Sequence, residues 1–206
     1  MEHLINGLQL TGKLIAMPQA GHEAFGEAFY YLTLNVPRLS GAEDLLPVTV
    51  SKRLLEEVKL EPGGMLSIEG QVRSHNKVID GASRLLITAF AQRLMEADPH
   101  RNPNLLLLTG TLCKAPVYRT TPFGREIADL MLAVNRPYGR SDYIPCITWG
   151  RSARFCSRLR VGDRISLSGR LQSRAYQKQF PDGACVEKVA YEVSVSQIEL
   201  LAGTHL

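Results

Sequence analysis

Aromatic and arginine side chains alternate between residues 138 and 176 of this sequence. An aromatic ring offers a flat face on which a nucleic-acid base can stack, and a lysine or arginine can hold a phosphate. The stacking candidates are Tyr138, Tyr143, Trp149 and Tyr176. The phosphate candidates are Lys114, Arg119, Arg125, Arg136, Arg140, Arg151, Arg154, Arg170 and Arg174. The pattern predicts a surface for single-stranded nucleic acid. The alternative is that Trp149 and the tyrosines fill a protein core.

Basic residues gather in the second half of the chain. Residues 1–100 contain nine Lys and Arg and twelve Asp and Glu, a net charge of −3. Residues 101–206 contain fifteen and eight, a net charge of +7. A strongly basic half favours a polyanionic partner, although a basic surface that serves only solubility has the same composition.

The two halves of the chain resemble each other. LQLTGKL at 8–14 is similar to LLLTGTL at 106–112, and LEPGGMLSIEGQVRS at 60–74 is similar to LRVGDRISLSGRLQS at 159–173. Such pairs recur in the same order at a nearly constant offset, which predicts two similar domains in tandem. The expected boundaries are 1–97 and 105–206, with a linker rich in Pro and Asn at 98–104.

Each half has the pattern of a small all-β domain. In the first half, alternating or continuous apolar runs predict strands at 8–16, 29–36, 47–51, 65–73 and 84–94, with a helix at 52–60. The second half repeats this order, with its helix at 151–159. Five strands with one helix between the third and the fourth is the element order of an OB-fold, a partly open Greek-key barrel. The expected fold is therefore two tandem OB-folds, although other small barrels fit the same pattern.

Residues 105–200 resemble the bacterial single-stranded DNA-binding proteins. The matching positions are Pro116, Arg119, Pro122 and Gly124, then the segment Trp149-Gly150-Arg151, then LRVGDRISLSGRLQSRAY at 159–176. Family members stack bases on aromatic residues at four places, which fall on Tyr138, Tyr143, Trp149 and Tyr176. The resemblance implies an OB-fold that binds single-stranded DNA without sequence preference, in replication, recombination or repair.

The resemblance also implies an assembly, with two departures from the family. Most bacterial members assemble four OB-folds, so two folds per chain imply a homodimer. The connection at 135–143 is shorter than in the family, which suggests a smaller DNA footprint. The sequence ends in QIELLAGTHL without the acidic tip that recruits other proteins, so that recruitment is not expected.

The first half lacks the aromatic pattern of the second. Ser51, Leu45 and Lys77 stand near the positions that correspond to Trp149, Tyr143 and Tyr176. With its negative net charge, this half is expected to serve structure or assembly. Arg73 and the segment 75–77 could still contact a passing strand.

Other classes of function find little support in the sequence. The five histidines are scattered, and there is no P-loop, G-x-S-x-G or H-E-x-x-H motif, so we expect no catalysis, no cofactor and no small-molecule substrate. The four cysteines form no C-x-x-C pair, which favours free thiols in the cytoplasm and no metal site. No apolar run is long enough to span a membrane. Two alternatives stay open, a protein-binding assembly module and a binder of single-stranded RNA.

Overall fold

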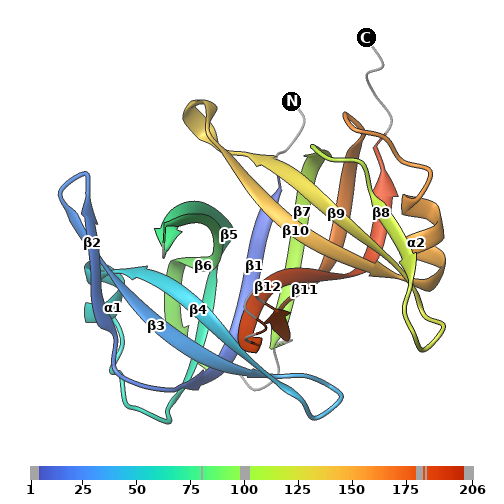
Figure 1. The fold of residues 1–206 in the computed structure, drawn as a ribbon. Coiled ribbons are helices and arrows are strands. Elements are labelled where there is room, and N and C mark those ends of the chain that lie inside the picture. The colour runs from blue at the N-terminus through green and yellow to red at the C-terminus, as the bar shows by residue number, and fades with distance from the viewer. Residues whose placement is uncertain (1–4, 80, 98–102, 180–182, 184, 202–206) are drawn as a thin grey trace.

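The computed structural model describes residues 5–79, 81–97, 103–179, 183 and 185–201. Twelve strands and three short helices make up this part of the chain (Figure 1). The N-terminal half contains β1 (Asn6–Leu14), β2 (Gln19–Ala24), β3 (Glu27–Pro37), β4 (Glu43–Ser51), α1 (Lys52–Glu56), β5 (Met65–Ile79) and β6 (Ala82–Glu96). The C-terminal half contains β7 (Asn104–Leu112), β8 (Val117–Thr120), β9 (Glu126–Asn135), the 3-10 helix η1 (Pro137–Gly139), β10 (Ser141–Trp149), α2 (Gly150–Cys156), β11 (Arg164–Gln179) and β12 (Cys185–Leu200).

Each half closes into a barrel of the OB type. In the N-terminal half, β1 pairs with both β5 and β3, and β4 pairs with β6 in parallel. In the C-terminal half, β7 pairs with both β11 and β9, and β10 pairs with β12 in parallel. The all-β fold of two tandem OB-folds is thereby confirmed. Most of the expected linker lies outside the described residues, and its last residue, Asn104, begins β7.

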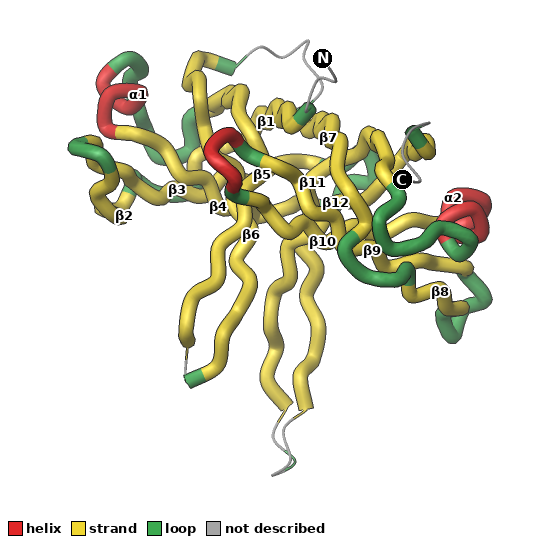
Figure 2. Tube along the Cα trace, turned by 90° about the horizontal axis from the view of Figure 1, so that it is seen from above, coloured by secondary structure: helices red, strands yellow, loops and turns green. Residues whose placement is uncertain are grey.

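The predicted elements need three corrections. The strands β2 and β8 were not expected, because nearly all of their side chains are exposed and no apolar alternation marks them. The helices α1 and α2 end at Glu56 and Cys156, earlier than predicted. The strands β5 and β11 run beyond the barrels and form long hairpin arms with β6 and β12 (Figure 2).

The two barrels share one sheet and one apolar core. Strand β1 pairs antiparallel with β7, with Leu8 opposite Leu106. Both leucines are buried and belong to a cluster that draws residues from both halves. Each fully buried leucine contributes about 1.5–3 kcal/mol, so this junction holds the halves together by ordinary core packing.

A bulge in each arm strand requires glycine. The register shifts at Gly70 in β5 and at Gly169 in β11. A Cβ at Gly70 would lie 2.0 Å from the carbonyl oxygen of Phe90, and one at Gly169 would lie 2.3 Å from that of Ser194. No side chain fits at such distances, so glycine at these bulges lets each arm strand stay paired with its neighbour.

Two matching ion pairs connect the halves; we call them the interdomain clamps. In the first, Arg38 binds both carboxylate oxygens of Asp44, at 2.7 and 2.5 Å, and Asp44 accepts the Ser173 N–H at 2.7 Å. In the second, Arg136 binds both oxygens of Asp142, which accepts the Ser74 N–H at 2.5 Å. Both aspartate side chains are fully buried. Each clamp therefore ties the arm of one half to the barrel of the other.

Candidate nucleic-acid interface

Two of the four predicted stacking residues lie on one exposed face of β10. Tyr143 and Trp149 are six residues apart, and side chains at an even spacing on a strand point to the same side. Their exposed fractions are 46% and 42%. The intervening strand is held between β9 and β12. Trp149 therefore does not fill the core, and its ring is accessible to a ligand.

Tyr176 belongs to the same face through the strand order. Ile147 in β10 lies beside Ser194 in β12, and Ser194 lies opposite Arg170 in β11. Arg170 and Tyr176 are six residues apart on β11, so Tyr176 points to this face as well. Its ring is 38% exposed, and the Arg174 guanidinium carbon lies 5.8 Å from the ring centroid. We call this surface, defined by Tyr143, Trp149 and Tyr176, the C-terminal platform.

The fourth stacking candidate, Tyr138, lies in η1. This helix stands between β9 and β10, directly before the strand that carries Tyr143. The Tyr138 side chain lies outside the described part of the structure.

Four of the nine predicted phosphate residues are exposed and hold no ion pair with the described residues. They are Lys114, Arg125, Arg140 and Arg151. Two more form ion pairs at the surface, namely Arg119 with Asp129 at 3.0 Å and Arg154 with Glu126 at 2.6 Å, whereas Arg174 pairs at 3.1 Å with the buried Glu192. Exposed pairs are worth about 1 kcal/mol or less, so a phosphate can compete with Asp129 for Arg119 and with Glu126 for Arg154.

The last two phosphate candidates have other surroundings. Arg170 donates to Gln172 at 3.1 Å, and burial, together with repulsion from Arg38, lowers its pKa. Arg136 has a structural role, because its guanidinium is bound by the buried Asp142 and also donates to the Ser74 carbonyl at 3.2 Å. A phosphate would have to displace that buried carboxylate, so we no longer count Arg136 among the candidate phosphate-binding residues.

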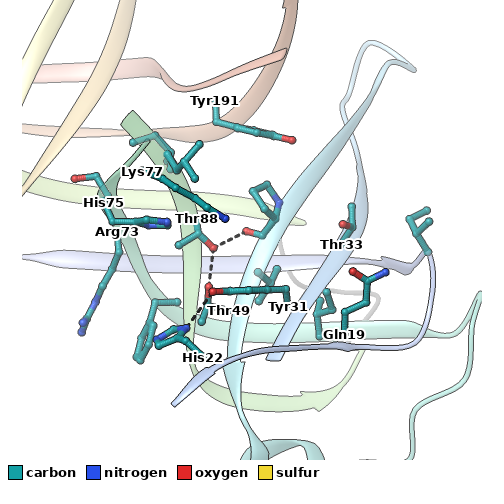
Figure 3. A pocket seen from close by; sticks show the side chains of 18 of the residues that line it. Gln19, His22, Tyr31, Thr33, Thr49, Arg73, His75, Lys77, Thr88 and Tyr191 are labelled. Carbon is teal, nitrogen blue, oxygen red and sulfur yellow. Dashed lines mark hydrogen bonds between the residues drawn. The ribbon is translucent and has the colours of Figure 1, made fainter. Parts of the chain in front are cut away.

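The corresponding face of the N-terminal half carries different residues. Ser51 is buried, and Leu45 is 50% exposed. A groove of about 1000 Å³ opens on this barrel, and Arg73, His75 and Lys77 line it (Figure 3). Sequence reasoning singled out these three residues as possible strand contacts. It did not assign three aromatic residues of the N-terminal half, His22, Tyr31 and Phe90, to this groove, because they occupy positions that are not aromatic in the second half.

Features of other site classes are absent from the described residues. Within these residues, no three His, Cys, Asp or Glu side chains gather in a way that could hold a metal ion. The same part of the chain has no helix long and apolar enough to cross a membrane.

The fold and this exposed aromatic and basic face define a tandem OB-fold protein. Residues 103–201 match the model of the single-strand binding protein family. The chain is 36% identical over 96 residues to single-stranded DNA-binding protein A of Bacillus subtilis, covering 43% of this chain and 56% of that protein. It is 40% identical over 83 residues to single-stranded DNA-binding protein 1 of Staphylococcus aureus, covering 37% and 50%. The chain thus spans about half the length of the curated relatives it matches.

The fold of the whole chain also has a solved counterpart. The wild-type single-stranded DNA binding protein from Thermus aquaticus superposes with a TM-score of 0.78 at 24% identity, covering 100% of this chain and 97% of that one. This likeness shows the fold of both halves. The match to the single-strand binding protein family model lies within the C-terminal half.

Proposed function

We propose that the C-terminal platform binds single-stranded DNA without sequence preference and without catalysis, in support of replication, recombination or repair. The observation that carries this proposal is the exposure of Trp149 and Tyr143 on one face of β10. The relatives that match this half bear the name single-stranded DNA-binding protein.

The platform has the two components that such binding needs. Stacking on an aromatic ring contributes about 1–3 kcal/mol per base, and it does so for every base because each has a π face. The exposed Arg140 and Arg151 stand near the two ends of β10, where they can hold the phosphates on either side of bases stacked on the strand. Duplex DNA buries its base faces, so the platform favours a single strand.

Titration of Trp149 fluorescence with oligo(dT) tests this function, since Trp149 is the only tryptophan. We expect strong quenching that weakens as salt increases, because bound phosphates release counterions, and none with duplex DNA. A matched RNA oligomer reports whether the site prefers DNA. Absence of both quenching and a gel shift would contradict the proposal.

Substitution at Trp149 separates stacking from charge. We expect Trp149→Ala to lower oligo(dT) affinity about 5- to 150-fold, which corresponds to about 1–3 kcal/mol. Trp149→Phe keeps a ring and should retain most of the affinity, as measured by fluorescence anisotropy of labelled oligo(dT). Equal losses in both variants would argue against stacking at this position.

We propose further that the chain forms a homodimer with four OB-folds in total. The support is the tandem arrangement together with the exposed face of the sheet formed by β6, β5, β1, β7, β11 and β12, on which Leu107 is 44% exposed. Light scattering should then give about twice the chain mass of 22.8 kDa. A mass of one chain over the whole concentration range would contradict the dimer.

A further inference from the structure

The groove on the N-terminal barrel is basic although its half of the chain carries a negative net charge. Its charged lining consists of Arg73, Lys77, Arg136 and Arg140, and no described Asp or Glu lines it. The histidines His22 and His75 line it as well. The acidic residues that give this half its negative charge therefore lie elsewhere, and the groove suits an anion.

One half-buried cation in the groove, Arg73, forms no ion pair with the described residues. Half-buried Arg73 donates through Nη2 to Gln71 at 2.9 Å, while its Nε has no acceptor. Asp142 attracts it but is already bound on both oxygens by Arg136. Burial, together with repulsion from Arg136, lowers the pKa of Arg73. An anion beside Arg73 would relieve this repulsion and satisfy the vacant N–H.

Aromatic rings stand beside these charges. The Arg73 guanidinium carbon lies 4.2 Å from the centroid of the Phe90 ring. His22 stacks on Phe29 with centroids 5.0 Å apart, and its Nδ1 lies 3.0 Å from the Tyr31 hydroxyl. The Tyr31 side chain is 44% exposed. These contacts hold the rings in place before any ligand binds, which lowers the entropy cost of stacking a base there.

The groove corresponds to the face of the C-terminal platform but uses other positions. Tyr31 and Phe90 both lie beside Thr49, and Asp129 and Ser194 both lie beside Ile147. The strand registers therefore equate Tyr31 with Asp129 and Phe90 with Ser194. The platform residues of the second half lie on β10 and β11, which correspond to β4 and β5, whereas Tyr31 and Phe90 lie on β3 and β6. A comparison of the two halves position by position therefore does not reveal these aromatic residues.

The C-terminal half completes one side of the groove. Arg140 and Tyr191 line it, and Figure 3 shows Tyr191 entering from the neighbouring domain. Arg140 immediately precedes β10 and is exposed. This residue therefore stands between the groove and the strand that carries Tyr143.

We propose that this groove is a second binding site for single-stranded DNA, in which bases stack on Tyr31 and Phe90 and a phosphate lies at Arg73. A volume of about 1000 Å³ is at the upper end of the ~300–1,000 Å³ range of ligand pockets, so it holds more than one nucleotide. The inference rests on the proposed function of the C-terminal platform and extends it. A strand that leaves the platform at Arg140 enters the groove directly.

A relocated tryptophan tests occupancy of the groove. In the double variant Tyr31→Trp, Trp149→Phe, the introduced tryptophan reports on the groove, while Trp149 in the unmodified chain reports on the platform. We expect a long oligo(dT) to quench both reporters. Quenching of Trp149 alone would overturn the groove proposal and leave the proposed function standing. If neither is quenched and anisotropy shows no binding, both fail.

Charge removal provides the second measurement. We expect Arg73→Met to weaken binding of long oligo(dT) at least 5-fold and to leave Trp149 quenching by a short oligomer unchanged. Lys77→Met, at an exposed groove residue, gives the same test should Arg73→Met fail to fold. Lys59→Met is the matched control, because it removes one exposed charge outside the groove. Losses no larger than in the Lys59 variant would overturn the proposal.

Discussion

Removal of the Asp44 carboxylate should loosen the connection between the two halves. Asp44→Ala deletes both bonds to Arg38 and the acceptor of the Ser173 N–H and hydroxyl. Breaking a buried ion pair by removing one partner costs about 3–5 kcal/mol. The Arg38 side chain is 21% exposed, so water can reach it, and we expect the low end of that range, about 3 kcal/mol.

The assay is thermal unfolding at neutral pH. For a chain of this length, 1 kcal/mol shifts Tm by about 2–4 °C, so Asp44→Ala should lower Tm by about 6–12 °C. Glu57→Ala is the matched control, since it also removes a carboxylate, from an exposed pair with Arg53, and should shift Tm by about 2 °C or less. Equal shifts in the two variants would refute a stabilising role for the clamp.

The pH dependence gives a second readout of the same clamp. Burial tends to raise the pKa of Asp44, but the hydrogen bonds from Arg38 and Ser173 outweigh it and hold the pKa below its ordinary value of 3.8. A lowered folded-state pKa contributes stability that is fully present above the unfolded pKa and is lost as pH falls through the folded value. The Tm difference between the unmodified chain and Asp44→Ala should therefore narrow below about pH 4. A constant difference down to pH 2 would contradict this linkage.

Two further predictions concern packing and thiols. Gly70→Ala should lower the free energy of unfolding by about 1–3 kcal/mol or more, because its Cβ would overlap the Phe90 carbonyl. Gly7→Ala, where a Cβ meets nothing within 4 Å, should change it by no more than about 0.5 kcal/mol in the same denaturant titration. With Ellman's reagent, exposed Cys185 should react in the native protein. Cys146 and Cys156 should react only after unfolding, because burial raises the pKa of both thiols; rapid reaction of all four would contradict the described packing.

Much of the fold was predictable because its signals are local. Alternating apolar residues mark the long strands, and the repeated segments mark the two barrels, since each depends only on neighbours along the chain. The strands β2 and β8 left no such signal, because hydrogen bonds to β3 and β9 hold them and not the burial of apolar side chains.

The candidate site was predictable in part for the same reason. Tyr143 and Trp149 lie on one strand, so their spacing alone places them on a common face. Arg136 was predicted to bind phosphate from its type and position in a loop. Its actual partner, Asp142, is only six residues away. The pair is buried, however, because the arm of the other half covers it, with the Ser74 N–H donating to Asp142. A contact of that kind has no trace in local sequence.

The sequence by itself determined that this chain forms two β barrels and that two rings of one barrel share a face, because strand periodicity and aromatic spacing are properties of short segments. That this face is exposed is a result of the tertiary structure. Only the tertiary structure decided where the arms lie, which arginines are available and that the N-terminal half has a basic groove. Tyr31, Phe90 and Arg140 come from β3, from β6 and from the segment before β10, and strand pairing and the clamps bring them to one place. Electrostatic and stacking interactions depend on distance in space, and that distance is set by packing between elements far apart in the chain.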